Sequence, residues 1–379
     1  MIGLPPFLSF SENERILQLK TLMIILRTVK NISSLNIAAS VLLFLAAILA
    51  AVVANSSLSP VYQDFLLQEL HLRIGNFNLF SHGGHPLKMI EFINDCLMTV
   101  FFLAVGLEIK RELLVGELSS VRKAALPFIA ACGGMVVPVV IYALSVASGT
   151  PETRGMAIPM ATDIAFSLGV LSLLGKRVPL SLKIFLTAFA VVDDIGGILV
   201  IALFYSADVA YGYLIAAAVL YVFLYYMGKF GVTQKIFFLF FGVIIWYLFL
   251  QSGIHSTISG VILAFVIPAR PRLDAGKYIE RIRDIIGEFP VSKSDNIVLT
   301  NAQIATLKQV ERASDYVISP LQSLEDNLHG AVSFVILPLF AFANAGVVFS
   351  GSGSIVGDVS IAVAAGLLLG KFLGIYLFT

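Results

Sequence analysis

Three aspartates and one lysine lie inside long apolar stretches of the sequence: Asp163, Asp193, Asp194 and Lys371. Ionised side chains are costly in the hydrocarbon core of a membrane, so four of them in one chain call for a chemical reason. Carboxylates bind protons or hard cations, and an ammonium group can balance one of them. Three carboxylates against one ammonium leave an excess of negative charge, which bound protons or a bound cation must neutralise.

The four residues share a depth if their stretches cross a membrane as helices. With a rise of ~1.5 Å per residue, each lies roughly 12–18 Å below the outer face of a core that is ~30 Å thick. Neighbouring helical residues point about 100° apart, so only one of Asp193 and Asp194 can pair with Lys371 while the other lines a cavity. If H⁺ and Na⁺ compete for these carboxylates and the site faces one side at a time, ion exchange follows. A purely structural Asp–Lys pair that joins two helices is the alternative, and Asp163 alone could cap a half-helix.

The composition is that of a membrane protein with many spans. Of the 379 residues, 58% are hydrophobic and 13% are charged, whereas soluble domains carry about a quarter charged residues. The mean hydropathy is +0.93. Ten apolar stretches are long enough to cross the bilayer as helices, the spanning form that these runs suggest. They are residues 36–54, 89–108, 124–147, 155–174, 181–205, 209–228, 233–250, 252–269, 329–349 and 359–379.

The basic residues alternate between rich and poor connections, as the positive-inside rule requires. The rich connections include the N-terminal arm and the long segment after the eighth stretch. This alternation predicts a cytoplasmic N-terminus. The predicted divisions are an arm over 1–35, spans one to eight over 36–269, a cytoplasmic loop insertion over 270–328, and spans nine and ten over 329–379.

Local patterns predict structure in two of the connections. Helical patches at Tyr278–Ile286 and Ile304–Val317 lie in the long cytoplasmic loop. In the first outer loop, Gly75 and Asn76 separate two short alternating runs, which predicts a β-hairpin over Leu72–Leu79.

The segment before Asp163 is unusual for a spanning helix. It contains Pro159 and Thr162 among small and flexible residues. Proline removes a backbone hydrogen bond and can break a helix. Broken helices in the middle of a membrane expose carbonyl groups and helix ends to ions in transporters.

Six segments of the chain, in order, resemble the NhaA family of sodium/proton antiporters. The resemblance covers the chain from about residue 30 onward. The segments are Phe101–Leu113, Ala161–Phe166, Val191–Gly196, Ser252–Thr257, Leu337–Gly346 and Gly370–Gly374.

The resemblance implies an all-α polytopic membrane protein with an inverted-repeat transporter fold and broken helices. It implies pH-regulated, electrogenic exchange of Na⁺ or Li⁺ for H⁺ across the bacterial inner membrane, with no cofactor and no enzymatic activity. Asp194 and Asp163 match ligands of the transported Na⁺, and Thr162 and Asp163 match the unwound stretch. Asp193 matches the acid that pairs with the buried lysine, here Lys371.

The resemblance also assigns residues outside the ion site. It places a pH-response group at the cytoplasmic mouth and a homodimer contact in the outer loop over residues 55–87. It implies no nucleic-acid partner. The residues of the pH-response group are Glu108, Arg111, Glu112, His255 and Glu325.

The chain departs from the family in two respects. The 270–328 loop is longer than in the best-known members, and the family's twelve spans exceed the ten predicted here. We therefore expect a fold that lacks the last two spans and is truncated after the tenth. The alternatives are a truncated, transport-inactive form and another proton-coupled carrier on the same scaffold. An intramembrane aspartyl protease is disfavoured, because the glycines follow Asp194 and do not precede it.

Overall fold

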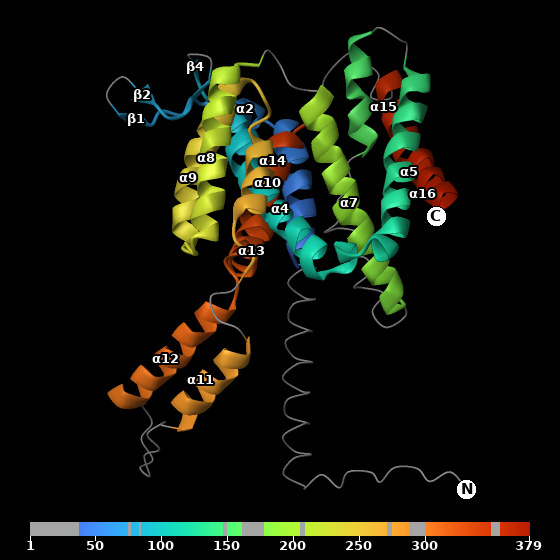
Figure 1. Ribbon diagram of the computed structural model, residues 1–379. Coiled ribbons are helices and arrows are strands. Elements are labelled where there is room, and N and C mark those ends of the chain that lie inside the picture. The colour runs from blue at the N-terminus through green and yellow to red at the C-terminus, as the bar shows by residue number, and fades with distance from the viewer. Residues whose placement is uncertain are drawn as a thin grey trace, which may run out of the picture.

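The computed structural model describes residues 38–74, 77–82, 85–146, 150–160, 178–204, 209–270, 275–287, 300–349 and 357–379. In this part of the chain most residues are helical, and Figure 1 shows long helices standing side by side. Helices are the form expected of these apolar runs, because a helix satisfies its own backbone hydrogen bonds where water is absent. The prediction of an all-α membrane protein is confirmed.

Six helices in the described residues are long and apolar enough to cross a membrane, and they correspond to six of the ten predicted stretches. Three of them are rods that contain a π-helical turn. The six are Met89–Val115 (α3 Met89–Phe92, η1 Ile93–Leu97 and α4 Met98–Val115), α5 (Val121–Ser145), α8 (Tyr211–Lys229), α9 (Lys235–Ser252), Pro320–Asn344 (α13 Pro320–Ala331, η5 Val332–Ile336 and α14 Leu337–Asn344) and Asp358–Phe378 (α15 Asp358–Ala365, η6 Gly366–Gly370 and α16 Lys371–Phe378).

The other four predicted stretches have different outcomes. The first is a helix over Ala38–Ala54, which is followed after a 112° bend by α2 (Ser59–Leu67). The stretch 181–205 is the 25-residue helix α7 (Leu180–Phe204). The stretch 155–174 is described only up to residue 160, where η3 (Pro151–Met160) is a 3-10 helix.

Two predicted boundaries differ from the structure for local reasons. Within 252–269 the helix α10 covers only Thr257–Val266, because Gly253 ends α9 in the left-handed conformation with φ 80°. The ninth stretch begins at Pro320 and not at residue 329. Ser319 caps this helix by accepting a hydrogen bond from the Gln322 backbone N–H, and proline suits the first helical position.

Two β-hairpins lie at one end of the helices, as Figure 1 shows. β1 (Arg73–Ile74) pairs antiparallel with β2 (Phe77–Asn78), which confirms the hairpin predicted from Gly75 and Asn76. A second hairpin, which the sequence analysis missed, joins β3 (Ser81–His82) to β4 (His85–Pro86).

The long loop contains two helices, α11 (Ala275–Gly287) and α12 (Asn301–Val317). They confirm the helical patches predicted there. The two helices contact each other, and Figure 1 shows them projecting away from the spanning helices.

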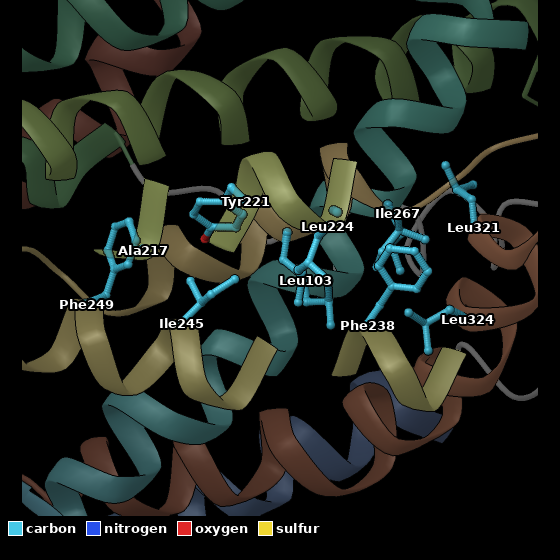
Figure 2. Close-up of a cluster of buried hydrophobic side chains, with 13 residues drawn as sticks. Leu103, Ala217, Tyr221, Leu224, Phe238, Ile245, Phe249, Ile267, Leu321 and Leu324 are labelled. Atoms are coloured by element: carbon cyan, nitrogen blue, oxygen red, sulfur yellow. The ribbon is translucent and has the colours of Figure 1, made fainter. Parts of the chain in front are cut away.

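The helix α4 takes part in two separate cores. Its residues Leu103 and Leu107 belong to a cluster with α8, α9, α10 and α13, which Figure 2 shows. Ile109 belongs to a second cluster, which is formed mainly by α5 and α7. The packing of α4 on α10 is close, because a Cβ added to Gly106 would lie 2.8 Å from the Cβ of Ala264.

The rods Met89–Val115 and Pro320–Asn344 are joined near one end by a pair of side-chain amides. Asn344 Nδ2 donates to Asn94 Oδ1 over 2.8 Å, and Asn94 Nδ2 lies 3.2 Å from Asn344 Oδ1. The rods therefore run antiparallel, since residue 94 is near the start of one and residue 344 is at the end of the other.

Candidate ion site

Asp193 lies in the middle of α7 and forms an ion pair with Lys371. Lys371 Nζ lies 2.7 Å from Asp193 Oδ2, and the two side chains are 12% and 3% exposed, respectively. Asp193 follows the buried run Ala188–Val192, which packs on α5. Both partners of this charge pair are thus held in the interior of the protein. The attraction between opposite charges is stronger there than in water. The structure brings together the acid and the lysine that the sequence analysis paired.

Glycines on the last helix bring Lys371 to this position. Gly366, Gly370 and Gly374 are spaced four residues apart, so they share one face of the rod. A Cβ on Gly370 would lie 2.7 Å from Cα of Pro138 on α5, and a Cβ on Gly374 would overlap the Gly133 carbonyl oxygen. Small residues at a helix interface allow the backbones to approach closely in a membrane. The lysine itself follows the π-helical turn Gly366–Gly370.

Asp194 points in a different direction from Asp193 and is half-buried. The nearby Gly196 faces α5, since a Cβ there would overlap the sulfur of Met135. The structure therefore separates the two acids as expected, with one in an ion pair and the other turned about 100° around the helix axis.

Thr162 and Asp163 lie outside the described residues. The described part of their segment ends at Met160, which is buried. Pro159 is also buried, and a Cβ on Gly366 would lie 2.8 Å from its Cβ. The described part of this segment therefore ends next to the glycine face of the last rod.

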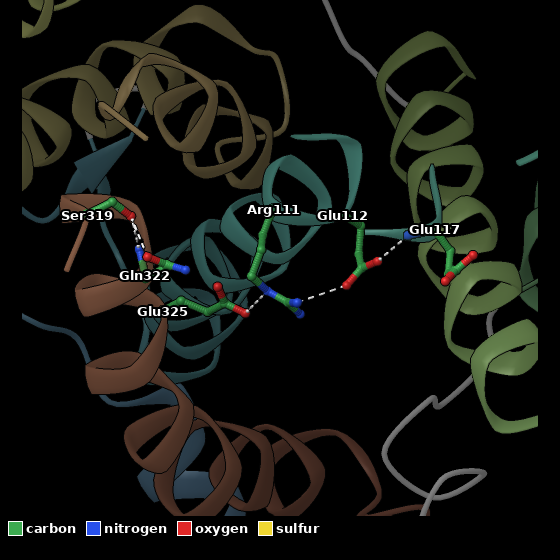
Figure 3. A network of polar contacts seen from close by, with 6 residues as sticks. All are labelled: Arg111, Glu112, Glu117, Ser319, Gln322 and Glu325. Carbon is green, nitrogen blue, oxygen red and sulfur yellow. Dashed lines mark hydrogen bonds and ion pairs between the residues drawn. The ribbon is translucent and has the colours of Figure 1, made fainter. Parts of the chain in front are cut away.

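A second charged group lies at the end of α4, as Figure 3 shows. Arg111 Nη1 lies 2.9 Å from Glu112 Oε1, and Arg111 Nε donates to Glu325 Oε1 of α13 over 2.9 Å. Glu112 is 8% exposed and its carboxylate also accepts the Glu117 backbone N–H over 3.2 Å. Glu108, one turn earlier, interacts electrostatically with all three residues. Four of the five predicted pH-response residues are thus neighbours.

His255, the fifth, does not lie with the others, and its expected place at the same mouth is wrong. It lines a cavity at the opposite end of the Met89–Val115 rod, near Asp95. Asp95 and Arg111 are sixteen positions apart on this rod, which is about 24 Å at the helical rise. The reason is that Gly253 ends α9, so that His255 lies just before the first residue of the short helix α10. The other end of α10 is the one that meets the end of α4.

Lys110 is a functional candidate that the sequence analysis missed. Its ammonium donates to the carbonyl oxygens of Ala264 at 3.3 Å and Phe265 at 2.7 Å, and also to that of Ile267. These are the carbonyls that a helix leaves unsatisfied at its C-terminus. Pro268 is the signal in the sequence for this helix end. Because the helix does not continue past this proline, no later backbone N–H groups bind its last carbonyls.

The helical bundle, with a buried acid–lysine pair and a second acid beside it, defines an integral membrane protein of the transporter class. A sequence model of the Na⁺/H⁺ antiporter 1 family matches residues 30–379, and the chain belongs to this family.

Three curated relatives illustrate the similarity, and each carries the name Na(+)/H(+) antiporter NhaA. The protein from Bacteroides thetaiotaomicron is 76% identical over 357 residues, which are 94% of this chain and 81% of the relative. That from Parabacteroides distasonis is 50% identical over 365 residues, with 95% and 80% covered. That from Porphyromonas gingivalis is 47% identical over 360 residues, with 93% and 79% covered.

Proposed function

We propose that this chain exchanges Na⁺ or Li⁺ for H⁺ across the bacterial inner membrane. The observation that carries the proposal is the buried ion pair between Asp193, in the middle of α7, and Lys371 of α16, with the half-buried Asp194 next to Asp193. The names of the relatives support the choice of ions.

Asp194 is the proposed carboxylate that binds the transported ion. Na⁺ is a hard cation and prefers oxygen ligands, and the same carboxylate can instead take a proton. Because one carboxylate cannot hold both, binding of either ion displaces the other. Thr162 and Asp163 are proposed to supply further oxygen ligands for the Na⁺.

Lys371 sets the charge of the site. Its ammonium balances Asp193, and we assign Asp194 as the carboxylate whose charge a transported ion neutralises. We propose that more than one proton moves for each Na⁺, with Asp163 and the Asp193–Lys371 pair as further proton-binding groups. Such exchange moves net charge and is electrogenic.

The charged group at the end of α4 is the proposed pH-response element. Glu108, Glu112 and Glu325 surround Arg111, so protonation of any of them changes the charge balance around one guanidinium. Because Arg111 joins α4 to α13, such a change alters how firmly the two helices are held. His255 is proposed to respond separately, from the other end of the rod.

The proposed orientation follows the positive-inside rule, with the N-terminus in the cytoplasm and the hairpins outside. We further propose that the loop over residues 55–87 contributes to a homodimer, through the two-stranded β1–β2 hairpin that it contains.

The proposal is tested in everted membrane vesicles with a fluorescent pH probe. Addition of Na⁺ to energised vesicles should release protons from the lumen and restore the fluorescence. Asp194→Asn should abolish the response, whereas Asp326→Asn, which alters an exposed acid on α13, should keep it. A response that survives in Asp194→Asn contradicts the assigned carboxylate. A folded wild-type protein without any Na⁺ response contradicts the exchange itself.

A further inference from the structure

The β3–β4 hairpin places two histidines directly opposite each other. His82 of β3 is the cross-strand partner of His85 of β4. Residues directly opposite in an antiparallel pair have their Cβ atoms about 4.5–5.5 Å apart and on the same face. Alternation along the strands puts both imidazoles on the same face as Phe80 and Leu87.

That face is turned toward the body of the protein. Leu87 is buried with Trp246 and Leu250 of α9, and Phe80 packs against this cluster. The hairpin is also tied to α9 by Gln251, whose Nε2 donates to the Ser81 carbonyl over 2.5 Å. The two imidazoles therefore lie over the end of α9 and do not extend away from the membrane domain.

Both histidines line a cavity of about 570 Å³. Three carboxylates line it, from Glu69, Glu91 and Asp95, together with a third imidazole from His255 and the ammonium of Lys88. Asp95 is close enough to His82 and to His255 to interact with their charges. The cavity thus combines three carboxylates with a pair of exposed imidazoles at its edge, and these groups can bind a cation.

The chemistry of this pair is that of a transition-metal ligand. Imidazole nitrogen suits Zn²⁺, Cu²⁺ and Ni²⁺, whereas Na⁺ and Mg²⁺ prefer oxygen. Two rings that leave adjacent strands side by side can reach one ion at the usual Zn–N distance of about 2.0–2.1 Å. Among the described residues no three His, Cys, Asp or Glu side chains are arranged to hold a metal. The pair therefore supplies two ligands and water supplies the remainder.

We propose that His82 and His85 form a two-imidazole site for a divalent transition cation, such as Zn²⁺, at the edge of this cavity. The site is separate from the Asp193–Lys371 pair and does not depend on the proposed ion exchange. A bound cation would fasten the two strands to each other beside Asp95 and the start of α10.

The test is Zn²⁺ titration of the purified full chain, carried out without a polyhistidine tag and read by competition with a Zn²⁺-binding dye. We expect one Zn²⁺ bound by the wild type. His82→Ala and His85→Ala should each weaken binding by roughly tenfold or more, since each removes one of two ligating nitrogens. His329→Ala is the matched control, because it removes an exposed histidine on α13 and should leave the affinity unchanged.

Cu²⁺ provides a spectroscopic readout that a merely structural effect would not produce. The electron paramagnetic resonance spectrum of the wild type should show coupling to two imidazole nitrogens, and each single variant should show coupling to one. Thermal unfolding of the metal-free variants should match that of the wild type. The proposal is overturned if the wild type binds no Zn²⁺, or if the affinity is unchanged in His82→Ala and His85→Ala.

Discussion

Gly374 of α16 and Gly133 of α5 touch backbone to backbone, one turn beyond the lysine that pairs with Asp193. A Cβ on Gly374 would overlap the Gly133 carbonyl oxygen and lie 3.1 Å from the Cβ of Val137. Because backbone cannot rotate away as a side chain can, the last rod would have to move as a whole to admit even a methyl group. The position of Lys371 is therefore set by glycines on its own helix.

Gly374→Ala is expected to destabilise the protein by about 1–3 kcal/mol, the usual cost of overpacking a tight interface. The measurement is thermal unfolding in detergent. Gly330→Ala is the matched control, because a Cβ at this helical glycine meets nothing within 4 Å. The control should be neutral or stabilising by up to about 1 kcal/mol, as alanine favours helix more than glycine does. Equal stability of Gly374→Ala and wild type would show that the interface yields easily.

The Asp193–Lys371 pair should behave as a coupled unit. Lys371→Met leaves the Asp193 carboxylate buried without its counter-charge and is expected to cost about 3–5 kcal/mol. Adding Asp193→Asn should recover a large part of that loss, because the buried charge disappears with its partner. Unfolding of the wild type, both single variants and the double variant gives the interaction energy. Additive losses would contradict a direct pair.

Removal of the Lys110 ammonium should loosen the end of α10. Lys110→Met deprives the carbonyls of Ala264, Phe265 and Ile267 of a shared donor, at an expected cost of about 1–3 kcal/mol. Hydrogen exchange should accelerate in the last turn of α10 first. Lys229→Met at the exposed end of α8 is the control and should leave exchange in α10 as it is in the wild type. Uniform acceleration across all helices would indicate general destabilisation instead.

The Arg111–Glu325 contact should depend on ionic strength. The two side chains are 33% and 20% exposed, so the pair is partly screened by solvent and is expected to contribute no more than about 1 kcal/mol. Glu325→Gln should therefore lower stability slightly at low salt. The difference from the wild type should shrink toward about 1 M salt, where the screening length is near 3 Å. A difference that persists at high salt would mean that packing, and not charge, holds α13 to α4.

The sequence predicted the parts of this fold that depend on local chemistry. Apolar runs of about 20 residues marked most of the helices, and Gly75–Asn76 marked the first hairpin. The pairing of one acid with Lys371 followed from charge balance and helix geometry. The choice of Asp193 came only from the family resemblance, and the structure has that pairing.

Other features depended on contacts that no local pattern encodes. A sequence period near 3.6 does not distinguish the π-helical turns before Lys371 and around Asp95 from ordinary helix. The cap on α10 by Lys110 joins residues more than 150 positions apart. His255 was misplaced because the resemblance groups it with Arg111, whereas the short helix α10 begins at the opposite end of the rod. Glu325 was placed correctly beside Arg111 despite the long loop that precedes it.

The rods Met89–Val115 and Pro320–Asn344 are fastened at their two ends by unlike chemistry. At one end the amides of Asn94 and Asn344 exchange hydrogen bonds, and amides do not titrate. At the other end Arg111 holds Glu325 by charge, which salt weakens. High salt therefore weakens the contact at one end of the rods and leaves the amide contact at the other end unchanged, so one change of solution acts unequally on the two ends.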